Sequence, residues 1–468
     1  MRTPRKEGAT ESGRAFLVFS PRFSCTENPT PSACGFGIII AMKNKVILLS
    51  VLGLALSGAA EMKTPETSSL FQRYVDPVSE VVSYILKPGL VADNQQSIYF
   101  TAKSMTDDGR FLVFWTSANE FVKVNGKPPS LRKATAVVDF LQEKAIRLDD
   151  LTASTPFIDV QTDQMWYVAR RPDRICRRDL LVDPTKEIEV CRLPVETILA
   201  KGESVSYWCT HITLTQGRDK AFLDIGIRCP DKTMRYVEGT IEFATGQWEE
   251  WCRAPFYCNH GQLNPKNDNL AMCAWECCWR SEEGLRWKEI SQVYPRIWLF
   301  RKGQRPELIV PELKNGATHE TWDEDGTGFY WCCGGVYHCD LETRKQEHIC
   351  PLFASHATKS ANNRYVTFDC PIGPWYRGSS WKVGFWNRDT QRGIYLHSKR
   401  PPLCPKDDGW HHHPDPHPQF VCKDRYIVCT INNADGHMDL SVTPVAQLVS
   451  GTAVDAPHAV DATKVKGR

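Results

Sequence analysis

The feature that most limits how this chain can fold is a short pattern that returns seven times. Each copy is a polar turn followed at once by a strand of β-branched and aromatic residues, and successive copies start roughly 40–60 residues apart. The turns contain pairs such as Asp108-Gly109 and Asn362-Asn363, which readily adopt the positive φ angles of tight hairpins. The seven copies are Thr106–Trp115, Thr162–Val168, Gln216–Leu223, Lys266–Met272, Asp323–Tyr330, Asn362–Phe368 and Lys423–Cys429.

A second strand follows each copy and runs into another polar hairpin, as in Thr240–Gly246 and Tyr337–Thr343. The period of amphipathic helices is almost absent. Repeats of this length, each about four strands long, are typical of the blades of a β-propeller. We therefore predict an all-β fold, a seven-bladed β-propeller that forms a single domain after an N-terminal signal peptide. A pair of β-sandwiches and a β-solenoid are the alternatives.

The first sixty residues have a pattern that does not belong to a folded domain. Residues 1–41 show no helix or strand period, and we interpret them as a start-site artefact or a disordered extension. After Met42, two lysines precede the apolar run Val46–Leu56, and small residues follow it. This is the pattern of a secretory signal peptide, and the run is shorter than a transmembrane helix. We expect a signal peptide at 42–60, the propeller at 61–468, and a mature protein that is periplasmic or secreted.

Composition argues against some partners and predicts the environment of the cysteines. The formal net charge of +2 gives no electrostatic reason to expect nucleic acid, or a membrane after signal cleavage, as a partner. Seventeen of the nineteen cysteines follow Glu61. Most lie in predicted strands, so we expect them to be buried and to pack as small apolar residues. Because the chain is expected to be exported, some pairs could instead form disulfides. Adjacent residues of a strand point to opposite faces and rarely share one ion, which disfavours a zinc site formed by Cys332, Cys333, His338 and Cys339.

Histidines are concentrated in the second half of the chain, where eleven of the thirteen lie between His260 and His437. Three of them, His260, His319 and His356, stand at nearly the same distance before a repeat turn. A residue a few positions ahead of this turn lies at the start of its blade's first strand, on one rim of the propeller. Consecutive blades would therefore offer imidazoles to one patch, which we interpret as a functional site.

The stretch Trp410–Pro418 supplies the next blade's contribution to that patch. It holds four imidazoles and one carboxylate, and three prolines stiffen its backbone. A stiff segment with His and Asp is suited to a metal site, because ligand geometry is held before the ion arrives. A solvent-exposed His-rich loop is the alternative. Since the stretch lies in the longest gap between repeat turns, we place it in an insertion near the central funnel.

Three segments carry a likeness to a known family. They are Asn259-His260, the run Thr318–Trp322 with Asp325-Gly326 behind it, and His417-Pro418 followed by Phe420. Through them the chain resembles the oligogalacturonate lyases, polysaccharide lyase family 22, over most of its length after the signal peptide. The resemblance implies a seven-bladed propeller that cleaves short uronate oligosaccharides by β-elimination, with a divalent metal, typically Mn²⁺, and a histidine base.

The resemblance also implies roles for single residues. It makes His260 the base that takes the C5 proton, and it places Arg235 near the family's substrate-binding arginine. The chemistry agrees, because a metal and an arginine can neutralise the uronate carboxylate while a neutral histidine removes the adjacent proton. Candidates for contact with the sugar are His356, Trp322 and Trp375.

The implied metal ligands depart from the family's segment Gln-x-x-His-Pro-His-Pro. Aligned without a gap on His417, the chain has His412 in place of the Gln and Asp415 in place of the first His. A two-residue insertion would instead restore both histidines through His413, with Trp410 in place of the Gln. We prefer the ungapped ligand set, which keeps His413 in reserve and consists of His319, His412, Asp415 and His417.

Two alternatives to an oligogalacturonide lyase stay open. One is a related propeller lyase for another uronate linkage, such as rhamnose–glucuronate or ulvan-type chains. The other is a carbohydrate-binding propeller without catalytic activity. The presence of His260 favours a lyase, because a metal site does not need this histidine and β-elimination does.

Overall fold

The computed structural model describes residues 61–122, 130–148, 155–169, 173–254, 258–275, 296–309, 317–372, 380–400, 415–433 and 437–461. The expected signal peptide lies outside the described residues, so that prediction stays untested. The chain from Ala60 to Arg468 forms one compact unit. Within the ranges given above, no helix is both long enough and apolar enough to cross a membrane.

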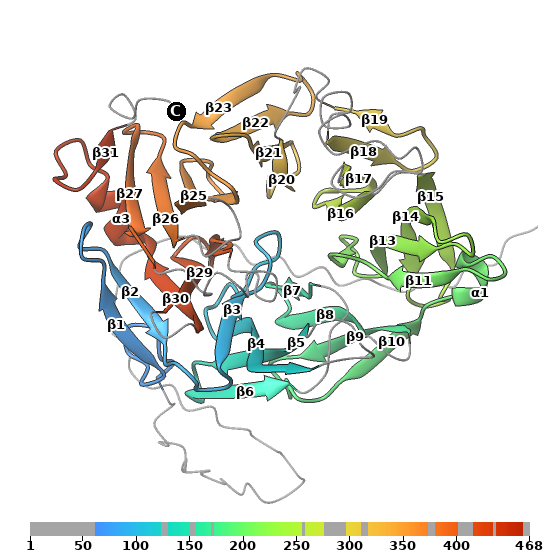
Figure 1. Ribbon diagram of the computed structural model, residues 1–468, viewed down its shortest axis with the longest axis horizontal. Helices are drawn as coiled ribbons and strands as arrows, with labels where there is room; N and C mark the ends of the chain where they lie inside the picture. Colours follow the sequence, from blue (N-terminus) through green and yellow to red (C-terminus); the bar gives the residue numbers. More distant parts are fainter. Residues whose placement is uncertain are drawn as a thin grey trace, which may run out of the picture. The chain divides into compact units, whose positions relative to one another are not determined.

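Seven antiparallel sheets make up this unit, and Figure 1 shows them arranged around a common centre. We number them as blades 1–7 in chain order of their innermost strands. The seven-bladed β-propeller that the sequence predicts is therefore confirmed, and the sandwich and solenoid alternatives are wrong.

The first four blades follow the chain from the centre outward. Blade 1 contains β3 (Asn94–Ser97), β4 (Phe111–Val122), β5 (Ser130–Asp139) and β6 (Lys144–Leu148). Blade 2 contains β7 (Phe157–Asp159), β8 (Gln164–Ala169), β9 (Arg174–Asp179) and β10 (Ile188–Arg192). Blade 3 contains β11 (Ser204–Tyr207), β12 (Thr213–Leu214), β13 (Lys220–Arg228), β14 (Met234–Glu242) and β15 (Trp248–Ala254), with the short helix α1 (Val195–Ile198) before it. Blade 4 contains β16 (Cys258–Asn264), β17 (Asn267–Trp275), β18 (Ile297–Arg301) and β19 (Glu307–Leu308).

The last three blades bring the two ends of the unit together. Blade 5 contains β20 (Thr318–Trp322), β21 (Gly328–Cys332), β22 (Val336–Asp340) and β23 (Gln346–Cys350). Blade 6 contains β24 (Ala357–Lys359), β25 (Tyr365–Ile372), β26 (Ser380–Asn387), β27 (Arg392–His397) and β31 (Val460–Asp461). Blade 7 contains β28 (Gln419–Val421), β29 (Tyr426–Asn432), β30 (Met438–Pro444), β2 (Val82–Leu86) and β1 (Phe71–Val75), and helix α3 (Val445–Gly451) follows β30.

The seven repeat turns join the first and second strands of the seven blades. Gly109 (82°), Gly326 (70°) and Asn363 (59°) have the positive φ angles that their Asp-Gly and Asn-Asn pairs predict. In the third turn the positive φ falls on Arg218 (56°), which the sequence did not predict. Backbone hydrogen bonds close these turns, such as Gly109 N–H to the Thr106 carbonyl at 3.0 Å. Each turn therefore fixes the register of its blade's inner hairpin, and with it the place of the residues just ahead of the turn.

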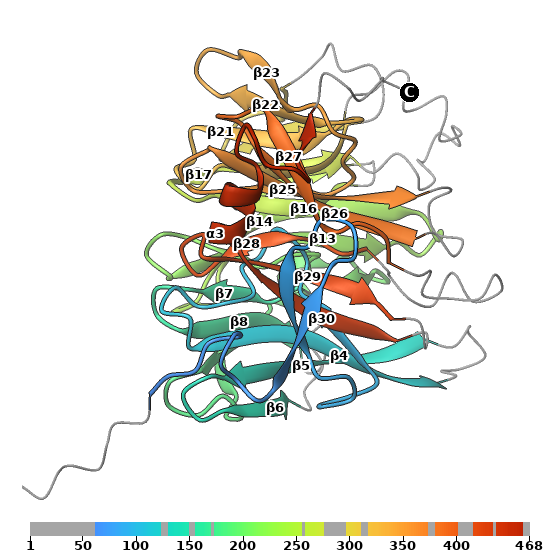
Figure 2. The same ribbon diagram turned by 90° about the vertical axis from the view of Figure 1, so that its left-hand side faces the viewer.

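Blade 7 closes the ring with strands from both ends of the chain. Strand β2 pairs with β30 in the register Tyr84↔Val442, and Figures 1 and 2 show the two strands side by side. The hydroxyls of Ser83 and Thr443 lie 2.7 Å apart across this junction. Leu86 and Val442 belong to the apolar cluster that packs blade 7 against blade 1.

The cysteines behave mainly as small apolar residues. The fourteen that the structure describes are free thiols, and all except Cys252 and Cys333 are buried. No disulfide joins any two of these fourteen.

Candidate metal centre and active site

Histidines from five successive blades meet at the centre of the propeller. They are His211, His260, His319, His356 and His417. Tyr99, just after β3, contacts four of the rings, with centroids 4.6 Å from His211 and 4.8 Å from His417. Phe100 packs 5.3 Å from His356. We call these seven residues the central cluster.

Backbone irregularities aim three of these histidines at the centre. His260, His319 and His417 have φ angles of 55°, 56° and 47°, in the left-handed region that side chains other than glycine rarely occupy. The pairing of β16 with β17 skips between Asn259 and Gln262, so His260 sits in a bulge of the innermost strand. The pairing of β20 with β21 skips in the same way around His319. Bulges of this kind redirect side chains and occur next to functional sites, where local strain is retained.

Three residues of this region form a group that could hold a metal ion. They are His356, Asp415 and His417, which offer ligand atoms that all lie within 4.8 Å of one another. All three are buried, and the Nε2 atom of His356 lies 3.8 Å from an oxygen of Asp415. Two imidazoles and one carboxylate form a donor set that suits Mn²⁺ and similar divalent ions.

Asp369, on the second strand of blade 6, holds this group in place. Its carboxylate accepts hydrogen bonds from the Nδ1 atom of His356 at 3.1 Å, and from the backbone N–H groups of His356 at 2.9 Å and His417 at 3.1 Å. The contact at Nδ1 leaves Nε2 of His356 directed at Asp415. A carboxylate behind a histidine is the usual support of a metal-ligating imidazole.

Burial also sets the charge of the supporting pair. It raises the pKa of Asp369 to about 8 and lowers the pKa of His356 to about 3. A neutral imidazole is the form that binds a metal, because the ligand nitrogen must be free of its proton. The site therefore favours an imidazole ready to bind rather than an imidazolium.

His319 stands beside this group with its own support. Its Nδ1 atom lies 2.6 Å from the Ser355 carbonyl oxygen, which leaves Nε2 as the nitrogen available to a ligand. Its ring centroid is 3.8 Å from that of His356. Burial, with the nearby His356 charge, lowers the pKa of His319 well below its ordinary value. The sequence-predicted ligands His319, Asp415 and His417 therefore come together, with His356 among them. His412 and His413 lie outside the described residues.

The predicted base, His260, contacts the same Tyr99 ring as His356 and His417 of the metal group. Its Nδ1 atom is 3.2 Å from the Tyr99 hydroxyl, and its backbone N–H donates to the Thr210 hydroxyl at 2.9 Å. The buried Asp224 in turn accepts the Thr210 N–H at 2.8 Å and the Gly261 N–H at 3.3 Å. These contacts fix the position of the His260 backbone within its bulge.

Two arginines are relevant to an acidic substrate. Arg296 donates to the buried Glu320 at 2.8 Å, and its charge contributes to the lowered pKa of both His319 and His356. Arg296 therefore lies close to the metal group. The sequence-predicted Arg235 is 48% exposed and pairs with Glu203 at 3.7 Å, outside the contacts of the central cluster.

The predicted sugar-contacting residues have different surroundings. Trp322 is 8% exposed, donates through Nε1 to the Gln262 carbonyl at 3.0 Å and packs in the core of blades 4 and 5. That position favours a packing role. His356 lies in the metal group, and its predicted contact with substrate stays untested. Trp375 lies outside the described residues.

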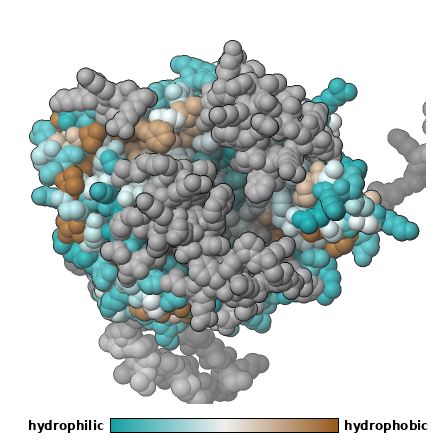
Figure 3. Space-filling view, viewed as in Figure 1, coloured by the Kyte–Doolittle hydropathy of each residue, from teal (hydrophilic) through white to brown (hydrophobic). Residues whose placement is uncertain are grey.

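Two cavities border the central cluster. The larger has a volume of about 460 Å³ and includes Phe100, His211 and Trp322 in its walls. The smaller, of about 140 Å³, is lined by Tyr99, Asp415 and His417 among others. The face seen in Figure 3 is mostly hydrophilic where it is not grey, with a recess near its middle. The metal group and Tyr99 are therefore next to open space.

Some residues of this region escaped the sequence reasoning. His211 precedes its turn at Gln216 by nearly the same offset as the other histidines, and extending the rule to blade 3 would have found it. Asp224 and Asp369 are charged residues in the middle of otherwise apolar strands, which is a signal for a buried polar role. Tyr99 and Arg296 carried no comparable signal.

Solved structures with a similar fold include two oligogalacturonate lyases. The crystal structure of oligogalacturonate lyase from Vibrio parahaemolyticus is 17% identical, with a TM-score of 0.61 over 80% of this chain and 96% of that one. An oligogalacturonate lyase in complex with manganese is also 17% identical, with a TM-score of 0.60 over 80% of this chain and 96% of that one. The likeness establishes a shared propeller fold. The sequence matches no protein-family model, and no curated protein is significantly similar to it.

Proposed function

We propose that this chain is a lyase that cleaves short uronate oligomers, most readily oligogalacturonides, by metal-assisted β-elimination. One arrangement carries the proposal: the Tyr99 ring contacts His260 and also His356 and His417 of the metal group. Elimination next to a carboxylate needs a base on one side of the sugar and a positive charge at the carboxylate. The similarity of the fold to two oligogalacturonate lyases supports the same proposal.

The donor set fits a divalent ion such as Mn²⁺. His356, Asp415 and His417 would hold it, with His319 as the neighbouring imidazole. When bound, the ion would neutralise the substrate carboxylate and stabilise the negative charge that develops beside it. One solved relative in fold is an oligogalacturonate lyase in complex with manganese, which supports this choice of metal.

The chain's own residues supply the proton transfers. His260 takes the C5 proton on Nε2, because its Nδ1 atom faces the Tyr99 hydroxyl. The electron pair of that C–H bond forms the new double bond, and the bond to the leaving sugar oxygen breaks. Tyr99 would return a proton to that oxygen. A general base of this kind contributes about 10²–10⁴-fold to the rate.

An arginine next to the carboxylate would assist the metal. We propose Arg296 for this position ahead of Arg235, because its charge reaches His319 and His356. Its ion pair with Glu320 fixes the guanidinium at the edge of the site.

A related linkage is the second candidate. Asp415 stands where the resembled family has a histidine, so the metal group carries one more negative charge than the family pattern implies. That change favours testing rhamnose–glucuronate and ulvan-type oligomers beside oligogalacturonides. We also propose that the protein is exported, on the basis of residues 42–60. Sequencing the N-terminus of the mature protein would test the export.

The proposal is tested by following ultraviolet absorbance of the unsaturated product after adding uronate oligomers and Mn²⁺. We expect a rise with oligogalacturonides for the wild type and its loss in His260→Ala. The matched control is His348→Ala, which changes a histidine on β23 outside the central cluster and should keep the activity. If oligogalacturonides, rhamnose–glucuronate oligomers and ulvan-type oligomers bind without any rise in absorbance, the protein would instead be a binding propeller.

A further inference from the structure

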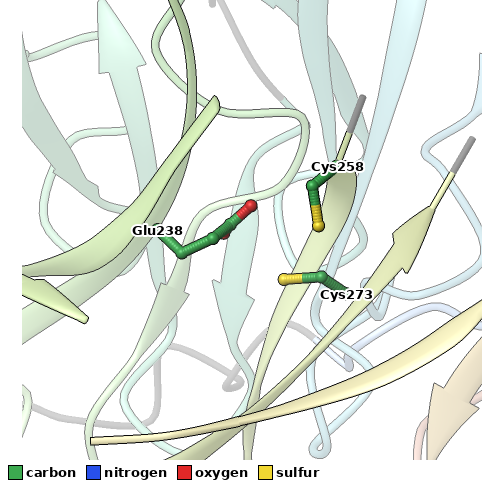
Figure 4. Close-up of side chains that lie close together, drawn as sticks. All are labelled: Glu238, Cys258 and Cys273. Carbon is green, nitrogen blue, oxygen red and sulfur yellow. The ribbon is translucent and has the colours of Figure 1, made fainter. Parts of the chain in front are cut away.

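A second group of metal-binding side chains lies between blades 3 and 4, separate from the group formed by His356, Asp415 and His417. It consists of Glu238 on β14, Cys258 at the start of β16 and Cys273 on β17. One ligand atom of each lies within 4.8 Å of the other two, and all three residues are 0% exposed. Figure 4 shows the Glu238 carboxylate directed from one sheet toward the two thiols of the next.

The surroundings of this group do not suit an isolated carboxylate. Phe222, Tyr236 and Phe300 belong to the apolar cluster that contains both cysteines. By distance and angle, no described residue other than the thiols of Cys258 and Cys273 donates a hydrogen bond to the Glu238 carboxyl. Thiols are weak hydrogen-bond donors, so they compensate a buried carboxylate less well than a bound cation would.

We propose that Glu238, Cys258 and Cys273 bind a thiophilic divalent cation, with Zn²⁺ as the ion of choice, and that this ion fastens blade 3 to blade 4. Thiolates and a carboxylate are ordinary zinc ligands, whereas Mn²⁺ prefers oxygen and imidazole. The two groups of the chain therefore differ in the metal that each selects.

A fourth ligand is available on the neighbouring strand. Cys252 on β15 is directly opposite Glu238 in the register of β14 and β15. Residues in this relation project from the same face of a sheet, with Cβ atoms about 4.5–5.5 Å apart. A set of three thiolates and one carboxylate would complete the tetrahedral shell that structural zinc prefers.

The position of the group gives the ion a structural role. Cys258 lies two residues before His260 on the same strand, and Glu238 is in register with Asp224. Asp224 accepts the Gly261 N–H next to His260 at 3.3 Å. An ion that joins β14 to β16 would therefore restrain the strand that carries His260. It would also stabilise the folded chain, because it binds the folded state and not the unfolded state.

The test measures zinc and its ligands in the purified mature chain after saturation with Zn²⁺ and removal of excess metal. We expect X-ray absorption to detect zinc with at least two sulfur ligands at about 2.3 Å. The double variant Cys258→Ser/Cys273→Ser should lose the sulfur-bound zinc. Cys191→Ser/Cys429→Ser, which changes buried cysteines outside both groups, should keep it. His417→Ala should also keep it, because only the second group supplies sulfur.

Further measurements keep the proposal testable if the double serine variant does not fold. Glu238→Gln preserves the side-chain size and should lose the rise in melting temperature that Zn²⁺ gives the wild type. Zinc bound by the wild type only through nitrogen and oxygen would overturn the proposal. So would peptide mapping that finds Cys258 and Cys273 joined in a disulfide.

Discussion

At the scale of single residues, one buried carboxylate controls how the metal group is presented. Asp369 accepts hydrogen bonds from the His356 ring and from the backbone N–H groups of both His356 and His417. It therefore sets the ring orientation of one ligand and the chain position of another. It does this without belonging to the three residues that offer ligand atoms.

Replacing this carboxylate should weaken metal binding while the fold persists. In Asp369→Asn the side chain keeps its size but can no longer ionise, and an amide can also turn a donor toward Nδ1. Loss of such a supporting contact typically lowers metal affinity by about 10–100-fold. Calorimetric titration with Mn²⁺ measures the change. The control is Asp76→Asn, a buried carboxylate that contacts Ser398 instead, and it should leave Mn²⁺ affinity unchanged. Equal affinity in Asp369→Asn and wild type would contradict the supporting role.

His397 predicts how stability depends on pH. It is 0% exposed, its Nε2 atom lies 2.9 Å from the Ser441 hydroxyl, and burial lowers its pKa from 6.5 to about 3. The unfolded chain therefore binds a proton between these values that the folded chain does not. Arg400 contributes to the lowered pKa, and Asp76 opposes it.

The sign follows from proton linkage: stability is lost as pH falls from about 6.5 towards 3. At pH 4 the uptake of this proton by the unfolded chain lowers the free energy of unfolding by about 3 kcal/mol. His397→Gln cannot take up this proton, so its urea stability should fall less steeply between pH 7 and pH 4 than that of the wild type. Parallel curves for the two proteins would show that His397 is not responsible.

At the scale of elements, the bulges of the innermost strands place the reactive side chains. Gly261 follows His260 within the bulge of β16, and a Cβ atom there would lie 2.9 Å from both Asp224 Cβ and Phe222 Cε1. Those distances are too short for ordinary packing, so the strand would have to shift. The shift would move His260 relative to Tyr99.

Gly261→Ala should therefore reduce both catalysis and stability. We expect overpacking to cost about 1–3 kcal/mol, and a displaced base can lower kcat by up to about 10²-fold. Gly303→Ala is the control, because it changes a positive-φ turn glycine with open space around it. It should cost stability through its backbone and leave kcat unchanged. A Gly261→Ala enzyme with wild-type kcat would show that the bulge does not position the base.

The elements also show what the sequence could predict. The seven turns could be predicted because each is a run of polar residues followed by a β-branched or aromatic strand, and three of them contain an Asp-Gly or Asn-Asn pair. They located the second strand of every blade. The bulges at His260 and His319 were not visible, since a register shift depends on pairing with a strand elsewhere in the chain. The alternation of buried and exposed residues along one strand does not report it.

At the scale of the whole molecule, the ring depends on two strands from the N-terminal end. Strands β1 and β2 complete blade 7 outside β30, and Leu86 at the end of β2 is 0% exposed. Its apolar cluster includes Phe114 of blade 1 and Val442 of blade 7. Blades 1 and 7 are neighbours in the ring, although β4 and β30 lie at opposite ends of the folded chain.

Shortening the Leu86 side chain should therefore weaken the packing between blades 7 and 1. We expect Leu86→Ala to lower the free energy of unfolding by about 2–5 kcal/mol, measured by urea denaturation. Val78→Ala, in the turn between β1 and β2, changes a residue that is 64% exposed and should have almost no effect. Similar stabilities for the two variants would indicate that the ring is closed by other contacts.

The whole site could be predicted only in part. The common offset of His260, His319 and His356 before their turns indicated one patch, and the propeller brings these residues together. His356 and Asp415 illustrate the remainder, because their shared metal group depends on how blades 6 and 7 pack. No single repeat contains that information.

The most direct test of the proposed elimination is the mass spectrum of the products from one oligogalacturonide of defined length. Elimination adds no water, so the masses of the two fragments should sum to the mass of the substrate, with one fragment unsaturated. The wild type with Mn²⁺ should give that pair and His260→Ala should give neither fragment. Fragments whose masses sum to the substrate plus one water would show hydrolysis and contradict the assignment of this propeller as a lyase.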